Sequence, residues 1–119
     1  MFIIDEDGDE GRVVKGIPVQ VSEIGDNGAV TKCALTLDYK ILPTDQSDAV
    51  IKAAQDGDDS SDLLKVVVVG WGQVKNRAGD TVDFSAKALD AACKKPNFRS
   101  AALNGYYRTA AGEKPRRGN

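Results

Sequence analysis

Alternation of apolar and polar residues in the first third of the chain most constrains how this protein can fold. Ile17, Val19 and Val21 alternate with polar residues or proline, which predicts a half-buried strand. The alternation returns further along, with apolar positions at Cys33, Leu35, Leu37, Tyr39 and Ile41. Residues 25–28 (Gly-Asp-Asn-Gly) separate the two segments, and Asn and Gly tolerate the positive φ of a hairpin turn. The pattern predicts an antiparallel hairpin whose apolar face needs a cover, and Pro18 places the first strand at a sheet edge.

The C-terminal third carries the signals of two consecutive helices. Ser85 is a good N-cap, and Phe84 before it suits a hydrophobic staple. The first helix should end near Lys94, because Pro96 fits the first turn of a second helix. Gly112 is a natural stop for that second helix. Its apolar face recurs at three- and four-residue steps, at Phe98, Ala101, Ala102, Gly105, Tyr106 and Thr109.

The most apolar stretch, residues 62–70, fits either a helix or a strand. The four valines from Val66 to Val69 favour a buried strand on propensity. Asp62-Leu63-Leu64-Lys65, preceded by two serines that can cap, favours a helix ending at Gly70. We adopt the helix, and we expect another short helix from about Ser47 to Gln55.

Together these patterns predict an α+β fold, in which an N-terminal β-hairpin or small antiparallel sheet is packed with three to four C-terminal α-helices. A length of 119 residues suits a single domain, 1–119. Residues 13–43 should form its β-rich part and residues 44–112 its mainly helical part. We expect residues 1–12 and 113–119 to be mobile, because both ends are polar and rich in charge.

The sequence lacks the residue combinations on which most enzymes depend. It contains no histidine, the commonest general base and metal ligand. Residues 5–16 imitate the first ligands of a calcium loop, but Glu10 replaces its glycine and Gly16 its bidentate acid. Cys33 and Cys93 lie too far apart in sequence to indicate a metal site or a disulfide framework. We therefore expect no enzymatic activity, no cofactor and no metal.

Charge is distributed unevenly along the chain. Residues 1–62 hold 14 Asp and Glu against 5 Lys and Arg, whereas residues 63–119 hold 4 against 11. The balances of −9 and +7 make the net charge of −2. Either an acidic half and a basic half meet head to tail between copies, or an acidic loop-rich part lies beside a helical part with a basic face.

Two partner classes are not expected from the sequence. No apolar run approaches the roughly 20 residues that span a bilayer, and the N-terminus lacks the features of a signal peptide. Lys94, Lys95 and Arg99 lie near Phe98 and Tyr106, a combination found in single-strand nucleic-acid platforms. Both rings, however, fall on the predicted core face, and the pI is about 5.1. A cytoplasmic protein that binds neither membrane nor nucleic acid is the expectation.

Residues 63–111 present a series of features in a distinctive order. An aliphatic stretch ends in a Gly-Trp step, and a polar turn, a Phe-Ser helix start, a proline break and an aromatic last helix follow. These features are Val69-Gly70-Trp71, Asn76 to Asp80, Phe84-Ser85, Leu89, Pro96, Phe98 and Tyr106-Tyr107. In this order they resemble the tail assembly chaperones of long-tailed bacteriophages. The likeness covers about half of the chain well.

The resemblance implies a non-catalytic protein of the host cell cytoplasm that is absent from the mature virion. Its partners would be the tape-measure protein and the tail-tube protein, and it would self-associate. The candidate contact residues are Val68, Trp71, Phe98 and Tyr107, although we favour a core position for the first three. The alternative function is a structural virion component, such as a head–tail joining or tail-associated protein.

Overall fold

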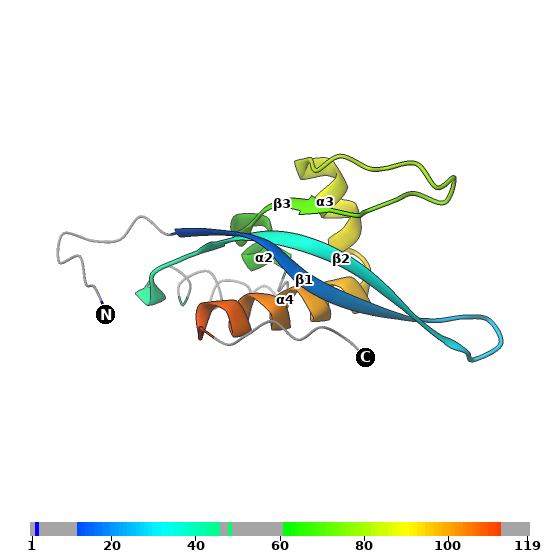
Figure 1. The fold of residues 1–119 in the computed structure, drawn as a ribbon, viewed down its shortest axis with the longest axis horizontal. Helices are drawn as coiled ribbons and strands as arrows, with labels where there is room; N and C mark the ends of the chain where they lie inside the picture. Colours follow the sequence, from blue (N-terminus) through cyan, green and yellow to red (C-terminus); the bar gives the residue numbers. More distant parts are fainter. Residues whose placement is uncertain (1, 3–11, 46–47, 49–60, 113–119) are drawn as a thin grey trace.

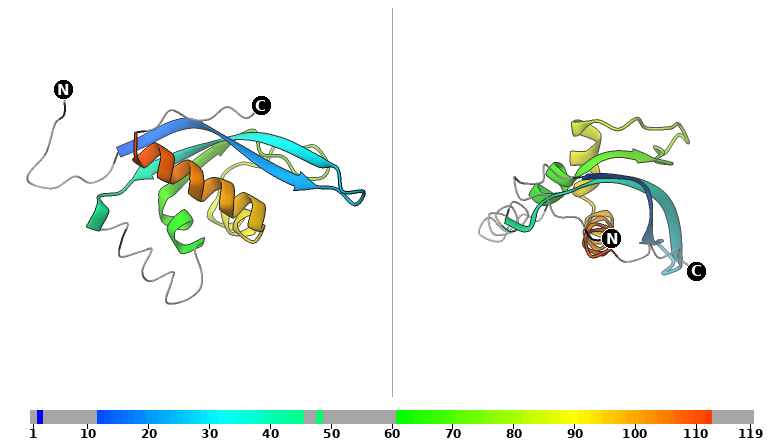
Figure 2. Two further views of the ribbon diagram at one scale, coloured as in Figure 1. Left: turned by 90° about the horizontal axis from the view of Figure 1, so that it is seen from below. Right: turned by 60° about the vertical axis from the view of Figure 1, so that its left-hand side comes forward.

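A three-stranded antiparallel sheet packed with helices forms the protein, as Figure 1 shows. The computed structural model describes residues 2, 12–45, 48 and 61–112. In chain order the elements are β1 (Arg12–Ile24), β2 (Val30–Ile41), α2 (Ser61–Val67), β3 (Val68–Gly72), α3 (Ala86–Cys93) and α4 (Pro96–Ala110). β2 is the central strand, and α4 crosses β1 and β2 (Figure 2). The predicted α+β class is confirmed.

The N-terminal hairpin has the predicted strands and turn, with a register shift between Val14 and Ile17. β1 pairs with β2 from Arg12–Ile41 to Ile24–Val30. In the turn, Gly28 has φ 81°, which glycine adopts without strain. β1 is an edge strand, as the proline in it predicted. Arg12, which the sequence places in a mobile end, belongs to β1. The other residues of the two ends, 1–11 and 113–119, lie outside the described residues except for residue 2. The helix expected from 47 to 55 also lies outside the described residues except for residue 48.

The helix expected over residues 62–70 is correct only for its first part. Helix α2 ends at Val67, and residues 68–72 form β3, so this prediction was wrong from Val68 onward. β3 pairs with the free edge of β2, where Leu37 lies opposite Trp71. A strand here satisfies the backbone groups of β2, and valine's β propensity favours it. The part from 44 to 112 is therefore not wholly helical.

The Gly-Trp-Gly sequence of β3 reflects the two faces of the sheet. Trp71 faces the core side, while its two glycine neighbours lie under side chains of β2 on the other face. A Cβ at Gly70 would come within 2.5 Å of Asp38 Oδ2, and one at Gly72 within 2.7 Å of Thr36 Oγ1. Both glycines thus make room for side chains from the central strand.

The two C-terminal helices begin and end as the sequence predicts. Ser85 Oγ accepts a hydrogen bond from Ala88 N at 3.0 Å and caps α3, which ends at Cys93. Pro96 occupies the first turn of α4. Gly112, just beyond α4, has φ 77°. The buried residues of α4 come from the predicted face and are Phe98, Ala102 and Tyr106.

Tyr39 of β2 joins the sheet to α4 at the centre of the core. Its side chain is fully buried, and its hydroxyl donates a hydrogen bond to the carbonyl of Ala102 at 2.8 Å. Its ring packs edge-on against Tyr106, with ring centroids 5.8 Å apart. The Tyr106 hydroxyl accepts a hydrogen bond from Leu42 N at 3.3 Å. Two tyrosines therefore satisfy their polar ends inside an apolar layer.

Burial of Tyr39 makes the fold sensitive to alkaline pH. Burial raises the pKa of its hydroxyl above the ordinary value of 10. Because the folded pKa exceeds the unfolded one, the stability that this group contributes is complete below about pH 10 and is lost as pH rises further. We expect the free energy of unfolding, measured by urea titration, to fall above about pH 10 and to fall less steeply in Tyr39→Phe. The exposed Tyr107→Phe is the control, and an equal slope in all three proteins would contradict the assignment.

Candidate functional site

Trp71 fastens β3 to the segment that leads into α3. Its indole Nε1 donates a hydrogen bond to the carbonyl of Val82 at 2.9 Å. Its ring meets that of Phe84 edge-on, with centroids 5.2 Å apart. The side chain is partly buried and packs against the core. Trp71 thus fixes the position of the loop that follows β3.

The loop between β3 and α3 is closed by its own hydrogen bonds. Val82 N donates to Val74 O at 2.8 Å, and Asn76 N donates to Asp80 O at 3.0 Å. Asn76 Oδ1 also accepts from Asp80 N at 3.0 Å. These contacts hold the loop as a short hairpin, which presents Lys75 and Arg77 at the surface.

A groove of about 480 Å³, the Trp groove, lies between the β1–β2 hairpin and this loop with α3. Its floor is apolar, and one wall consists of small residues from α3. The floor includes Val21, Leu35, Trp71 and Phe98, and the wall is Ala88, Ala91 and Ala92. The alanines recur at steps of three and four, so they lie along one side of the helix. A groove with such a wall admits the close approach of another backbone.

The rim of the Trp groove is mostly basic. Lys75, Arg77 and Lys95 line it, against the single acidic residue Glu23. Lys95 Nζ lies 3.6 Å from Glu23 Oε1 and holds the hairpin against the start of α4. The surplus positive charge around an apolar floor favours an apolar ligand with acidic flanks.

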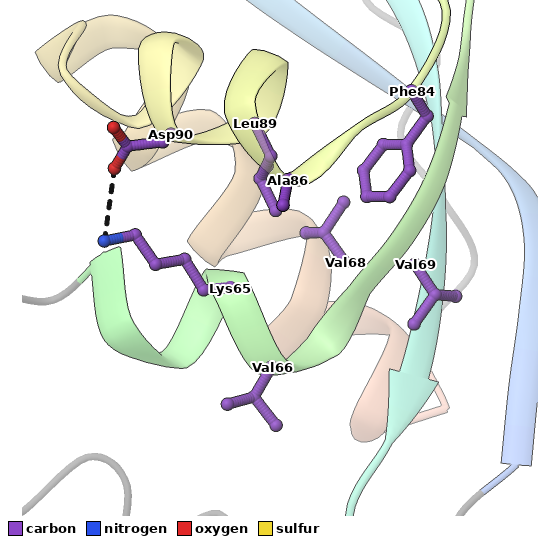
Figure 3. A pocket seen from close by; sticks show the side chains of 8 residues that line it. All are labelled: Lys65, Val66, Val68, Val69, Phe84, Ala86, Leu89 and Asp90. Atoms are coloured by element: carbon purple, nitrogen blue, oxygen red, sulfur yellow. Dashed lines mark ion pairs between the residues drawn. The ribbon is translucent and has the colours of Figure 1, made fainter.

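A second groove, the valine groove, lies between α2, β3 and the start of α3 and has a volume of about 530 Å³ (Figure 3). It is lined by Lys65, Val66, Val68, Val69, Phe84, Ala86, Leu89 and Asp90. Val66 is 45% exposed and Val69 is 41% exposed, a large fraction for aliphatic side chains. At its mouth Lys65 Nζ lies 3.2 Å from Asp90 Oδ1, and Lys94 Nζ lies 3.7 Å from Asp90 Oδ2.

The four contact residues suggested by the sequence occupy different places. Val68 is 2% exposed and Phe98 is 6% exposed, so both are core residues that show only an edge in a groove. Trp71 is partly buried and lines the Trp groove. Tyr107 is 46% exposed on α4 and lines neither groove. The structure brings Trp71 and Phe98 together and leaves Tyr107 apart.

The sequence reasoning missed the residues that give the grooves their character. Val66 and Val69 belong to a run of four valines, and which of these side chains are exposed depends on where the helix changes to a strand. The alanines of α3 did carry a signal, because small residues at helical spacing form a stripe. Nothing in the sequence around Lys75 and Arg77 indicates a binding surface, since only the fold brings these residues to the same groove as the hairpin.

The sequence does not predict a nucleic-acid platform around Phe98 and Tyr106. Phe98 is 6% exposed and Tyr106 is 2% exposed, which confirms their predicted core position. Of the basic residues beside them, Lys94 pairs with Asp90 and Lys95 with Glu23. These two aromatic rings therefore offer no face on which a base could stack.

Comparisons of the chain with protein-family models, with curated proteins and with solved structures found no match. Within the described ranges, no group of three or more His, Cys, Asp or Glu side chains could hold a metal ion. No helix in that part of the chain is long and apolar enough to cross a membrane. Cys33 is exposed and Cys93 is buried.

Proposed function

We propose that this protein is a non-catalytic phage tail assembly chaperone that binds an amphipathic helical segment of the tape-measure protein in the Trp groove. The observation that carries the proposal is the composition of this groove, which combines an apolar floor, an alanine wall and a basic rim. The tape-measure protein is proposed as the client because the order of sequence features around Trp71 resembles that of tail assembly chaperones.

The groove suits a helix better than a small molecule. It is open to solvent, and an amphipathic helix can lay a stripe of apolar side chains along its floor. The alanine wall of α3 allows the backbones to come close. Lys75 and Arg77 then face the acidic residues that flank such a stripe, which steers the client and fixes its direction.

Recruitment of tail-tube subunits, action in the host cytoplasm and absence from the mature virion belong to the same proposal. The rival function is a structural virion component, which would remain in the particle. Mass spectrometry of purified virions separates the two, because abundant peptides of this chain in the finished particle contradict a chaperone role.

Groove variants test client binding directly. We expect Ala91→Gln combined with Lys75→Glu and Arg77→Glu to weaken binding of the tape-measure protein at least about 10-fold, roughly 1.4 kcal/mol. The glutamine narrows the groove, and the two glutamates repel acidic flanks. Co-expression followed by affinity purification measures how much tape-measure protein stays soluble and bound.

The matched control reverses a charge on the same helix outside the groove. Lys87 is exposed on α3 and does not line the Trp groove, so Lys87→Glu should leave the bound amount unchanged. Thermal melts establish that all variants fold. Undiminished binding by the folded triple variant, or an equal loss in Lys87→Glu, contradicts the Trp groove as the client site.

A further inference from the structure

The edge of β2 that faces β3 is paired over only part of its length. β3 pairs with it at residues 36–39, and no described strand lies on this side of β2 between residue 36 and the hairpin turn. The open edge (residues 33–35) borders the Trp groove, which Cys33, Ala34 and Leu35 line one after another. Successive strand residues point to opposite faces of a sheet. A groove that touches all three therefore lies beside the edge of the strand.

The register of the hairpin shows which main-chain groups point toward this edge. Gly25 N donates to Ala29 O at 2.8 Å, and hydrogen-bonded pairs alternate with non-hydrogen-bonded pairs along an antiparallel ladder. Counted from this rung, the Gln20–Ala34 pair is non-hydrogen-bonded. The N–H and C=O of Ala34 therefore point away from β1 and toward the Trp groove. Ala34 is itself exposed.

Contacts at neighbouring rungs agree with this direction. Thr36, two residues after Ala34, uses the same side of β2 to pair with Gly72 of β3. Ser22 holds an outward-pointing position of β1, and its carbonyl accepts the hydrogen bond from Asn97 Nδ2 at 3.0 Å. The edge with which β3 pairs thus continues beyond β3, with a donor and an acceptor at Ala34 that no described strand uses.

The chain turns away from this edge at Gln73, directly after β3. Its φ of 65° is the left-handed conformation, which no other non-glycine residue in the described ranges adopts. The Lys75–Thr81 bridge then holds the following loop as a separate hairpin. In Figure 1 this loop, between β3 and α3, runs apart from β2. A strained residue at the point where a strand could continue leaves room for a strand from another chain.

We propose that an extended segment of a partner protein, with alternating apolar and acidic residues, adds as a further strand to the open edge of β2. Its main chain forms hydrogen bonds with Ala34, the mode of binding called β-strand addition. Every second side chain lies on the apolar floor beside Leu35 and Trp71. Lys75 and Arg77 on the rim favour acidic residues at the alternate positions.

The added strand and a client helix cannot occupy the Trp groove together. This consequence rests on the proposed function, in which the helix lies on the same floor and beside the same basic rim. A partner that carries such an extended segment would therefore release the tape-measure segment by competition. The strand addition itself requires no client, so it can be tested separately.

A synthetic peptide that alternates valine and glutamate over about six residues tests the strand addition. We expect it to bind the full chain with a dissociation constant below about 1 mM. Binding should slow the hydrogen exchange of the Ala34 amide, measured by NMR, because this N–H gains a carbonyl partner. The Gln20 amide points to the opposite edge of the hairpin and should not change. A helix in the groove would leave the Ala34 N–H without a main-chain partner, so the exchange identifies a strand.

Two proline variants on one rung separate the two edges of the hairpin. Ala34→Pro removes the N–H that faces the groove. Gln20→Pro is the matched control, because its missing N–H faces the outer edge of β1, where Pro18 is already accommodated. Neither change removes a hydrogen bond between β1 and β2, and thermal melts establish that both variants fold. Ala34→Pro should weaken peptide binding at least about 10-fold, whereas Gln20→Pro should leave it unchanged.

Modified peptides provide a test that needs no variant of the protein. In an added strand only alternate N–H groups face β2. Of two peptides methylated at all valine nitrogens or at all glutamate nitrogens, one should therefore bind and the other should not. Replacement of the glutamates by lysine should weaken binding at least about 10-fold, because Lys75 and Arg77 then repel the peptide.

Several outcomes overturn the strand addition. They are no binding up to about 1 mM, unchanged exchange at Ala34, equal binding of the two methylated peptides, and an equal loss in Gln20→Pro. Exchange at Ala34 that slows with protein concentration alone would show that a second copy covers the edge, which also overturns the proposal.

Competition is measured by adding the peptide to the complex with the tape-measure protein. We expect the bound peptide to lower the amount of tape-measure protein that is retained. If the groove variants lose the client but the bound peptide does not displace it, the competition is wrong. If the groove variants keep the client, the proposed function is contradicted, while the peptide and exchange results still decide the strand addition.

Discussion

Tyr39→Ala is expected to lower the free energy of unfolding by about 3–5 kcal/mol, the range for removing a large buried aromatic side chain. Tyr39 is fully buried at the junction of β2 and α4. Its loss leaves a cavity beside Tyr106 and removes the hydrogen bond to Ala102 O. Urea denaturation at neutral pH measures the change.

Tyr39→Phe separates the ring from the hydroxyl. Only the hydrogen bond is lost, and the carbonyl of Ala102 keeps its place in the backbone ladder of α4, so we expect a loss of about 1 kcal/mol. If the alanine variant were no less stable than the phenylalanine variant, the ring would not be a central part of the core.

Gly105→Ala should destabilise the protein by about 1–3 kcal/mol, although alanine is the better helix former. In an exposed helix the same change adds about 1 kcal/mol of stability. Here a Cβ would lie 2.5 Å from Tyr39 Oη and 3.2 Å from Val19 Cγ2. α4 would have to lift from the sheet, or Tyr39 would have to move and break its hydrogen bond. Urea denaturation again gives the magnitude.

A double-mutant cycle tests this cause. In the Tyr39→Phe background the hydroxyl that meets the new methyl is absent, so Gly105→Ala should cost less, with a coupling of about 0.5–3 kcal/mol. Asn104→Ala, at the exposed neighbouring position of α4, should instead add about 0.5 kcal/mol. Equal costs of Gly105→Ala in both backgrounds would show that the contact with Tyr39 is not the constraint.

The elements that the sequence predicted best are those with strong local signals. The hairpin follows from its alternation and its Asn-Gly turn, because each strand has one buried face and a slip of one residue would expose it. Helices α3 and α4 follow from Ser85, Pro96 and Gly112, whose side-chain or backbone chemistry ends or begins a helix whatever surrounds it.

The stretch after α2 could not be predicted in this way. Valine accepts either a helix or a strand when it is buried, so the residues alone do not say where one changes to the other. The free edge of β2 makes that decision, because residues of the 68–72 segment pair with it. The same change of element turns Val69 outward and Val68 inward, and so creates the valine groove.

The sequence by itself determined the hairpin, its turn, the two C-terminal helices and the prominence of Trp71. Its signals are local: side-chain alternation, caps and turns act within a few residues. Only the tertiary structure decided that β3 completes the sheet, that Val69 is exposed, and that the alanines of α3 face the hairpin across a groove. Those features depend on contacts between segments far apart in the chain, whose burial and backbone pairing no local pattern encodes.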